Sequence, residues 1–177
     1  FTGRQRTSVR KAERDGIKVK RHSSKMAMDI FSDFFAANVA EKGRKRIYTK
    51  KFYRALIETS GDDAVSVYLA ELAGRHISAI VILSWGNTAF YWASAHRPGE
   101  RVSGANNILL NQALKDASEE GRGIFNFGRS TGLNGVIKFK QSFGAVSTET
   151  RSLLYQSSTY RSVRRIKAGL PGSLRNI

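Results

Sequence analysis

The sequence predicts an α+β domain with a mostly antiparallel central sheet flanked by helices. Two observations lead to this prediction. Apolar residues repeat at helical spacing before and after a central block, residues 65–95. Within that block, apolar and polar residues follow strand patterns in segments that are separated by short turns. Helices segregated from a sheet of this kind define the α+β class. With 177 residues, 41% of them hydrophobic, the chain is long enough for one domain with a substantial core.

The chain before the central block is expected to contain a short helix, a short strand and two amphipathic helices. The first helix covers residues 8–15 and ends at Gly16, and residues 17–20 then alternate between apolar side chains and lysines. Residues 25–40 carry an apolar stripe at helical spacing. Thr49 is the expected N-cap of the next helix, because its hydroxyl oxygen can accept a hydrogen bond from an amide of the first turn.

Three strands are expected in the central block. Residues 65–70 alternate, residues 77–83 are apolar on both faces as in a central strand, and residues 90–95 form the third strand. The remaining expected elements are a helix with Ser103 as its N-cap, a brief strand at 124–127, a short helix at 136–143 and a final strand at 148–155.

Positive charge is concentrated at the two ends of the chain. The formal net charge is +16, yet residues 55–159 hold nine basic and nine acidic residues, so the excess lies in residues 1–54 and 160–177. We therefore expect a basic N-terminal segment over residues 1–24, a single domain over residues 25–159 and a basic tail after it. Such ends can dock a nucleotide diphosphate, RNA or anionic lipid head groups, or serve only as solubilising tails.

Several classes of protein are excluded by composition and spacing. The chain has no cysteine, which excludes disulfides, a thiol nucleophile and a zinc-thiolate site. His22, His76 and His96 do not have metal-ligand spacing. The longest apolar stretch, Ile77–Leu83, is far shorter than the roughly 20 residues that span a bilayer. We expect a cytoplasmic protein without stable membrane insertion, with the inner membrane face as an alternative location, and the first residue, Phe1, suggests that the chain was cut from a longer protein.

A motif in the C-terminal half provides a more specific signal. Residues 124–130 are Ile-Phe-Asn-Phe-Gly-Arg-Ser, and a glycine-rich loop leads from them to Phe-Lys-Gln-Ser-Phe-Gly at residues 139–144. The combination resembles the signature of FemAB-like proteins, the Fem-type peptidoglycan-bridge aminoacyltransferases. The opening residues 6–19 also resemble the entry to the second unit of such proteins, and the resemblance covers about residues 4–155.

This resemblance implies a GNAT-like acyltransferase fold, whose order of elements agrees with the order expected above. It implies transfer of an aminoacyl or acyl group to an amine of a cell-envelope precursor or glycan, with aminoacyl-tRNA or acyl-CoA as the acyl donor. The anionic substrate would be a nucleotide-linked precursor, tRNA or CoA. Fem-type proteins carry two GNAT units and this chain has room for one, so a second unit is an expected partner. The alternatives are an acetyl-CoA-dependent N-acetyltransferase and a non-catalytic basic module that binds RNA or another anion.

Lys140 and Phe139 are the candidate catalytic residues. Acyl transfer requires stabilisation of a developing oxyanion, and a fixed ammonium can supply this or bind a phosphate. Phe139 can hold the lysine stem by packing, and the resemblance points to the same pair. The alternative is a solvated helix lysine beside a core phenylalanine. Asn126 stands where many relatives have Asp, so this chain lacks a carboxylate base there, and Asn126 is expected to be a structural hydrogen-bonding group.

Five further residues are candidates for substrate binding. Arg129 and Ser130 end a strand and begin a loop, where binding groups gather on a rigid scaffold. Arg10 and Lys11 can meet the diphosphate of a nucleotide-linked substrate, or form a solvated basic face. Tyr91 lies beside Trp92 on a strand, so the two point to opposite faces, and one of them is expected to line a substrate groove.

Arg101, Ser103 and Gly104 are candidates for cofactor binding. They lie at the start of a helix, in the position where standard GNAT enzymes place their pyrophosphate loop, and the amides of a helix N-terminus bind phosphate well. The usual loop pattern is only partly met, because Asn106 fills its last position. A plain helix cap at Ser103 is the alternative.

Overall fold

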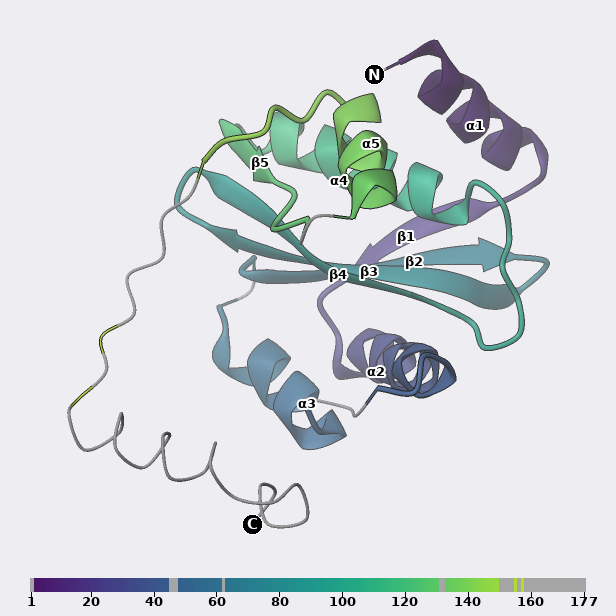
Figure 1. Cartoon of the computed structure of the whole chain (residues 1–177). Helices are drawn as coiled ribbons and strands as arrows, with labels where there is room; N and C mark the ends of the chain where they lie inside the picture. The colour runs from purple at the N-terminus through teal and green to yellow at the C-terminus, as the bar shows by residue number, and fades with distance from the viewer. Residues whose placement is uncertain are drawn as a thin grey trace, which may run out of the picture. The chain divides into compact units, whose positions relative to one another are not determined.

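A five-stranded sheet forms the centre of the protein, and each strand lies beside its neighbour in the sequence (Figure 1). The computed structural model describes residues 2–44, 48–61, 63–130 and 133–149, together with residues 155 and 157. The strands are β1 (Lys18–His22), β2 (Val65–Leu72), β3 (Arg75–Trp85), β4 (Thr88–His96) and β5 (Ile124–Asn126). Strands β1 to β4 are antiparallel to one another, whereas β5 is parallel to β4.

Helices cover both faces of this sheet, as Figure 1 shows. They are α1 (Gly3–Arg14), α2 (Lys25–Glu41), α3 (Lys50–Thr59), α4 (Ala105–Glu119) and α5 (Asn134–Ser142). Helices α1 and α4 bury one apolar cluster against the sheet, and α2 and α3 bury a second cluster against the opposite face. The predicted α+β class is therefore confirmed. No helix in the described ranges is both long and apolar enough to cross a membrane.

Strand β4 has a free edge over much of its length. It pairs with β5 only at Thr88, Ala89 and Phe90, and no other described strand pairs with this edge beyond Phe90. Its register with β3 also shifts, because Val81 pairs with Ala93 whereas Ile82 pairs with Tyr91. Trp92 is thus the extra residue of a β-bulge, a feature that re-aims side chains and is frequent near active sites.

The N-terminal segment is more ordered than the sequence indicates. Helix α1 begins at Gly3 rather than at residue 8, because Val9 and Ala12 bury a narrow apolar stripe that the surrounding charges obscure in the sequence. Helix α1 belongs to the compact unit Phe1–Ala145.

One local prediction is confirmed, one is wrong, and one lies mostly outside the described residues. The Thr49 hydroxyl oxygen accepts a hydrogen bond from the Phe52 amide at 3.2 Å, as expected of an N-cap. The N-cap of α4 is Gly104 and not Ser103, and no side chain caps this helix. Most of the final strand expected over residues 148–155 lies outside the described residues, and its described residues 148, 149 and 155 are not in a strand.

Candidate active site

Lys140 is buried on the last turn of α5, with 7% of its surface exposed. Its ammonium donates hydrogen bonds to the backbone carbonyls of Gly128 and Arg129, both at 2.9 Å. An ammonium carries three N–H donors, so one remains for a ligand after these two contacts. Burial lowers the pKa of Lys140, since desolvation disfavours the charged form. The solvated helix lysine is therefore excluded.

A cavity of about 470 Å³ lies between the free edge of β4 and the segment that leads from β5 into α5. We call it the Lys140 cavity. Four predicted residues line it together, namely Phe139, Lys140, Tyr91 and Arg129. The other lining residues are Phe90, Trp92, Ala93, Ser94, Asn106, Phe127, Gly128, Gly135 and Val136. None of these described lining residues is Asp, Glu or His, so they offer no carboxylate or imidazole base.

The turn at Gly128 brings the two walls of the Lys140 cavity together. Gly128 has a φ of +68°, and a Cβ at this position would lie 3.1 Å from the Phe90 ring. The Asn126 side-chain oxygen accepts a hydrogen bond from the Gly128 amide at 2.8 Å. Asn126 therefore shapes the backbone that supplies carbonyls to Lys140, in agreement with its expected structural role.

Tyr91 and Trp92 point to opposite faces of the sheet, as predicted, and both reach the Lys140 cavity. Burial raises the pKa of Tyr91, although hydrogen bonds with the Ser94 and Asn106 side chains oppose this shift. The phenol of Tyr91 is therefore neutral over the physiological pH range and is held in place by two polar neighbours.

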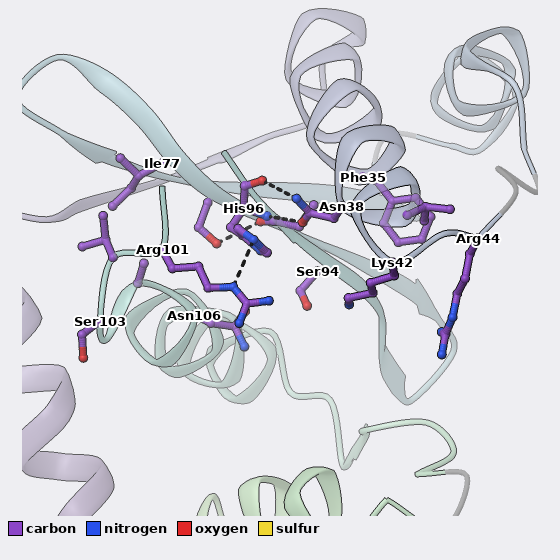
Figure 2. A pocket seen from close by; sticks show the side chains of 15 residues that line it. Phe35, Asn38, Lys42, Arg44, Ile77, Ser94, His96, Arg101, Ser103 and Asn106 are labelled. Carbon is purple, nitrogen blue, oxygen red and sulfur yellow. Dashed lines mark hydrogen bonds between the residues drawn. The ribbon is translucent and has the colours of Figure 1, made fainter. Parts of the chain in front are cut away.

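A second cavity, of about 550 Å³, lies where α2, β4 and the start of α4 meet (Figure 2). We call it the cationic cavity, because Lys42, Arg44 and Arg101 line it and no Asp or Glu does among the described residues. In Figure 2, Lys42 and Arg101 extend toward the same opening from opposite sides. Helix α4 begins here without a side-chain cap, so its first amides can face a bound anion.

Asn38 fixes the relative position of α2 and β4 in this cavity. Its side-chain amide donates to the His96 carbonyl at 2.9 Å and accepts from the His96 amide at 2.9 Å (Figure 2). The pairing brings the C-terminal end of α2, where Lys42 is the C-cap residue, to the cavity that Arg101 also lines. The sequence did not predict this role of Asn38. Its one signal in the sequence is a polar amide side chain close to the apolar stripe of α2.

His96 is neutral in this environment. Burial lowers its pKa first, and the nearby charge of Arg101 lowers it further. The Arg101 Nε–H donates a hydrogen bond to His96 Nε2 at 3.3 Å, which requires an unprotonated nitrogen. The imidazole therefore positions Arg101 without adding a charge to the cationic cavity.

The two cavities are joined along β4. Ser94 and Asn106 line both of them. Since a strand rises about 3.3 Å per residue, the five steps from Tyr91 to His96 give a groove of about 16 Å. The groove follows the edge of β4 with which no described strand pairs beyond Phe90, and at its cationic end the His96 amide and carbonyl are hydrogen-bonded to the Asn38 side chain.

The structure places the remaining predicted residues away from this groove or at its rim. Arg10 and Lys11 are exposed on α1 and line neither cavity. Ser130 also lines neither, and its carbonyl accepts a hydrogen bond from the Leu133 amide at 3.0 Å. Ser103 lines the cationic cavity, but Gly104 does not.

Gly104 has a packing role that the sequence did not reveal. Its φ is +83°, and a Cβ would lie 3.2 Å from the Ala12 Cβ of α1. Glycine is therefore needed where α1 crosses the start of α4. The described residues contain no group of three or more His, Asp or Glu side chains able to hold a metal ion.

Comparison with known families defines the class of protein. Residues 3–141 match the family described as acetyltransferase (GNAT) domain, which covers more than half of the chain. The protein belongs to this family, so its class is that of the GNAT acyltransferases. No match was found among the curated proteins.

Solved structures share the fold at low sequence identity. FemX is 15% identical with a TM-score of 0.69, over 81% of this chain and 54% of FemX, so the chain spans about half of that protein. A possible acetyltransferase from Clostridium difficile 630 is 12% identical with a TM-score of 0.64, over 80% and 97% of the two chains. An aminoglycoside acetyltransferase from an uncultured soil metagenomic sample, in complex with trehalose, is 14% identical with a TM-score of 0.60, over 82% and 98%.

Proposed function

We propose that this protein is an N-acyltransferase that moves an acyl group from an activated donor to a primary amine, with Lys140 stabilising the oxyanion. The observation that carries the proposal is the geometry of Lys140. The carbonyls of Gly128 and Arg129 hold two of its N–H groups and leave the third for a ligand in the Lys140 cavity. A preorganised donor of this kind costs no reorganisation when the charge develops.

The reaction has two bond changes. The amine nitrogen forms a bond to the acyl carbon, and the carbonyl electron pair moves to oxygen, where the Lys140 N–H donates to it. The oxyanion then collapses, and the bond from carbon to the leaving group breaks. The amine loses one proton and the leaving group gains one, so the overall charge is conserved. Because the described lining offers no carboxylate or imidazole base, the amine must enter as its neutral form or lose its proton to water.

The shape of the groove supports a phosphate-bearing donor such as an acyl-CoA. Its anionic part would occupy the cationic cavity, between Arg101 and Lys42, and face the first amides of α4. A linear arm with amide groups would follow the free edge of β4 for about 16 Å and present the acyl group to Lys140. Arg101 and Ser103 thus remain proposed cofactor-binding residues, whereas Gly104 would act only by positioning the helix.

A second candidate function is Fem-type transfer of an aminoacyl group from aminoacyl-tRNA to a cell-envelope precursor or glycan. The Phe139-Lys140 pair in its glycine-rich context and the structural likeness to FemX favour it. In this case a second unit and a location at the inner membrane face would be expected. Arg10 and Lys11, on the exposed face of α1, would contact only a donor as large as tRNA, because they lie outside both cavities.

A transfer assay with two donors tests these proposals. The chain is incubated with acetyl-CoA or with aminoacyl-tRNA and a set of primary amines, and the free thiol or deacylated tRNA is measured. Thiol release that depends on the amine supports the CoA-dependent function, and amine-dependent deacylation of tRNA supports the Fem-type function. Saturable, salt-sensitive RNA binding without transfer from either donor would refute both and favour the non-catalytic module.

A further inference from the structure

A chain of polar side chains connects the first turn of α4 to the last turn of α5 through α1. The Asn107 side-chain amide donates a hydrogen bond to the Gln5 side-chain oxygen. The Gln5 amide in turn donates to the Ser142 hydroxyl at 2.7 Å, and that hydroxyl donates to the Phe139 carbonyl at 2.6 Å. We call Asn107, Gln5 and Ser142 the polar tether. The three helices that it joins lie on the same face of the sheet (Figure 1).

Gln5 is the polar member of the buried side of α1. Only 9% of its surface is exposed, and the other buried residues of this helix, Val9 and Ala12, pack in an apolar cluster with α4. An apolar side chain at position 5 would extend that packing but would leave Asn107 and Ser142 without their shared partner. A buried amide is tolerated when both its donor and its acceptor are paired, and here one neighbour on each adjacent helix pairs them. Gln5 therefore fixes α4 and α5 against α1 at the same time.

Helix α5 depends on contacts of this kind for its position. Among its nine described residues, Lys140 alone is buried. A helix this short is marginal by itself in water, so tertiary contacts must hold it in place. Two of them come from the start of the chain: the Thr2 amide donates to the Ser142 carbonyl at 3.0 Å, beside the bond from Gln5 to the Ser142 hydroxyl. The N-terminal segment thus anchors the end of α5 that carries Lys140.

The polar tether ends next to the groups that the proposed reaction uses. Asn107 follows Asn106, which lines both cavities. Ser142 lies two residues after Lys140, and the carbonyl that it holds belongs to Phe139, the residue before Lys140. A displacement of about 1 Å at a reacting group can cost about 100-fold in rate. A small shift of α5 relative to α4 would therefore misdirect the remaining N–H of Lys140.

We propose that Gln5 is a positioning residue that holds Lys140 in register with the start of α4. Gln5 lines neither cavity, so it acts through the polar tether and contacts neither the acyl donor nor the amine. This inference rests on the proposed acyl transfer and adds a residue from the opposite end of the chain to its machinery. Because Gln5 affects only where the Lys140 N–H points when the oxyanion forms, its loss lowers kcat and leaves KM largely unchanged.

Two variants break the polar tether, and a third serves as the matched control. Gln5→Leu keeps a side chain of similar size and should lower kcat about tenfold, with the KM of donor and amine within about twofold of the native values. Ser142→Ala breaks the tether from its other end and should act in the same direction. Val9→Ala loosens α1 without removing a polar contact, so it should lower the midpoint of urea unfolding yet leave kcat within about twofold. An unchanged kcat in either tether variant would overturn the proposal, as would an equal loss of kcat in Val9→Ala.

A double-mutant cycle shows whether Gln5 acts through Lys140. Gln5→Leu should weaken binding of a phosphonate analogue of the tetrahedral intermediate about tenfold in the native background, and by less than about twofold in the Lys140→Met background. Equal weakening in both backgrounds would indicate a general structural role and overturn the positioning role, even where native transfer and its loss in Lys140→Met uphold the proposed function. No transfer by the native protein from either donor would refute that function and with it the role of Gln5.

Discussion

Replacing Lys140 with methionine tests the proposed chemistry with the least change in shape. Methionine is unbranched and of similar length but donates no hydrogen bond. Loss of one preorganised oxyanion donor typically lowers kcat by about 10²–10³, so we expect transfer to fall by at least tenfold. The carbonyls of Gly128 and Arg129 also lose their partner, which costs about 2 kcal/mol of stability at about 1 kcal/mol each.

The assay follows release of free thiol under saturating donor, with the free energy of unfolding measured on the same samples. Lys138→Met is the matched control, since Lys138 is exposed on the same helix and lines neither cavity. Burial lowers the pKa of Lys140, so activity should decline as the pH rises through that lowered pKa, below about 10.5. A folded Lys140→Met protein that transfers at the native rate would refute the reasoning.

Four further predictions concern the groove and the packing around it. Arg101→Ala should raise the KM for an acyl-CoA about tenfold and reduce the dependence of that KM on salt; an unchanged KM would remove Arg101 from the donor site. Burial and the charge of Arg101 lower the pKa of His96, so the unfolded state binds more protons than the folded state in mild acid. The melting temperature should therefore decrease when the pH is lowered from about 8 to about 5. Part of this decrease should be absent in His96→Gln. Gly104→Ala should cost about 1–3 kcal/mol in urea unfolding, because of its positive φ and its contact with α1. The double variant Arg10→Ala, Lys11→Ala should leave the rate of transfer from acyl-CoA within about twofold of the native rate, because neither residue lines a cavity. The same variant should bind RNA more weakly. A large rise in the KM for the donor would contradict the placement of these residues outside the cavities.

Much of the fold was predictable because apolar periodicity is a local property of the sequence. The stripe of α2, the cap at Thr49 and the alternation of β2 each follow from residues close together in the chain. Helix α1 was only partly found, because the charged side chains around Val9 and Ala12 conceal its short apolar stripe.

The candidate site was predictable where it lies at the ends of elements. Arg129, Phe139 and Lys140 meet in one cavity because the end of β5, the turn at Gly128 and α5 follow one another along the chain, and Tyr91 joins them from the middle of β4. The contribution of Asn38 was not predictable, since its contact with the backbone of His96 joins residues 58 positions apart. Contacts of this kind depend on how α2 packs on the sheet.

The bulge at Trp92 could not be predicted for a different reason. Its existence depends on the register between β3 and β4, and simple alternation of the two strands suggests an unbroken pairing. That one-residue shift places Ala93 and Ala95 on the α2–α3 face, whereas unbroken alternation from Tyr91 would place them on the face that α1 and α4 cover.

The central claim is that the free N–H of Lys140 binds the oxyanion of the tetrahedral intermediate more strongly than it binds the substrate. The dissociation constant of a phosphonate analogue of that intermediate, measured by calorimetry on the native protein and on Lys140→Met, tests it most directly. We predict that the substitution weakens the analogue about 100-fold and the unreacted substrates by less than about threefold. Equal weakening of analogue and substrates would contradict the claim.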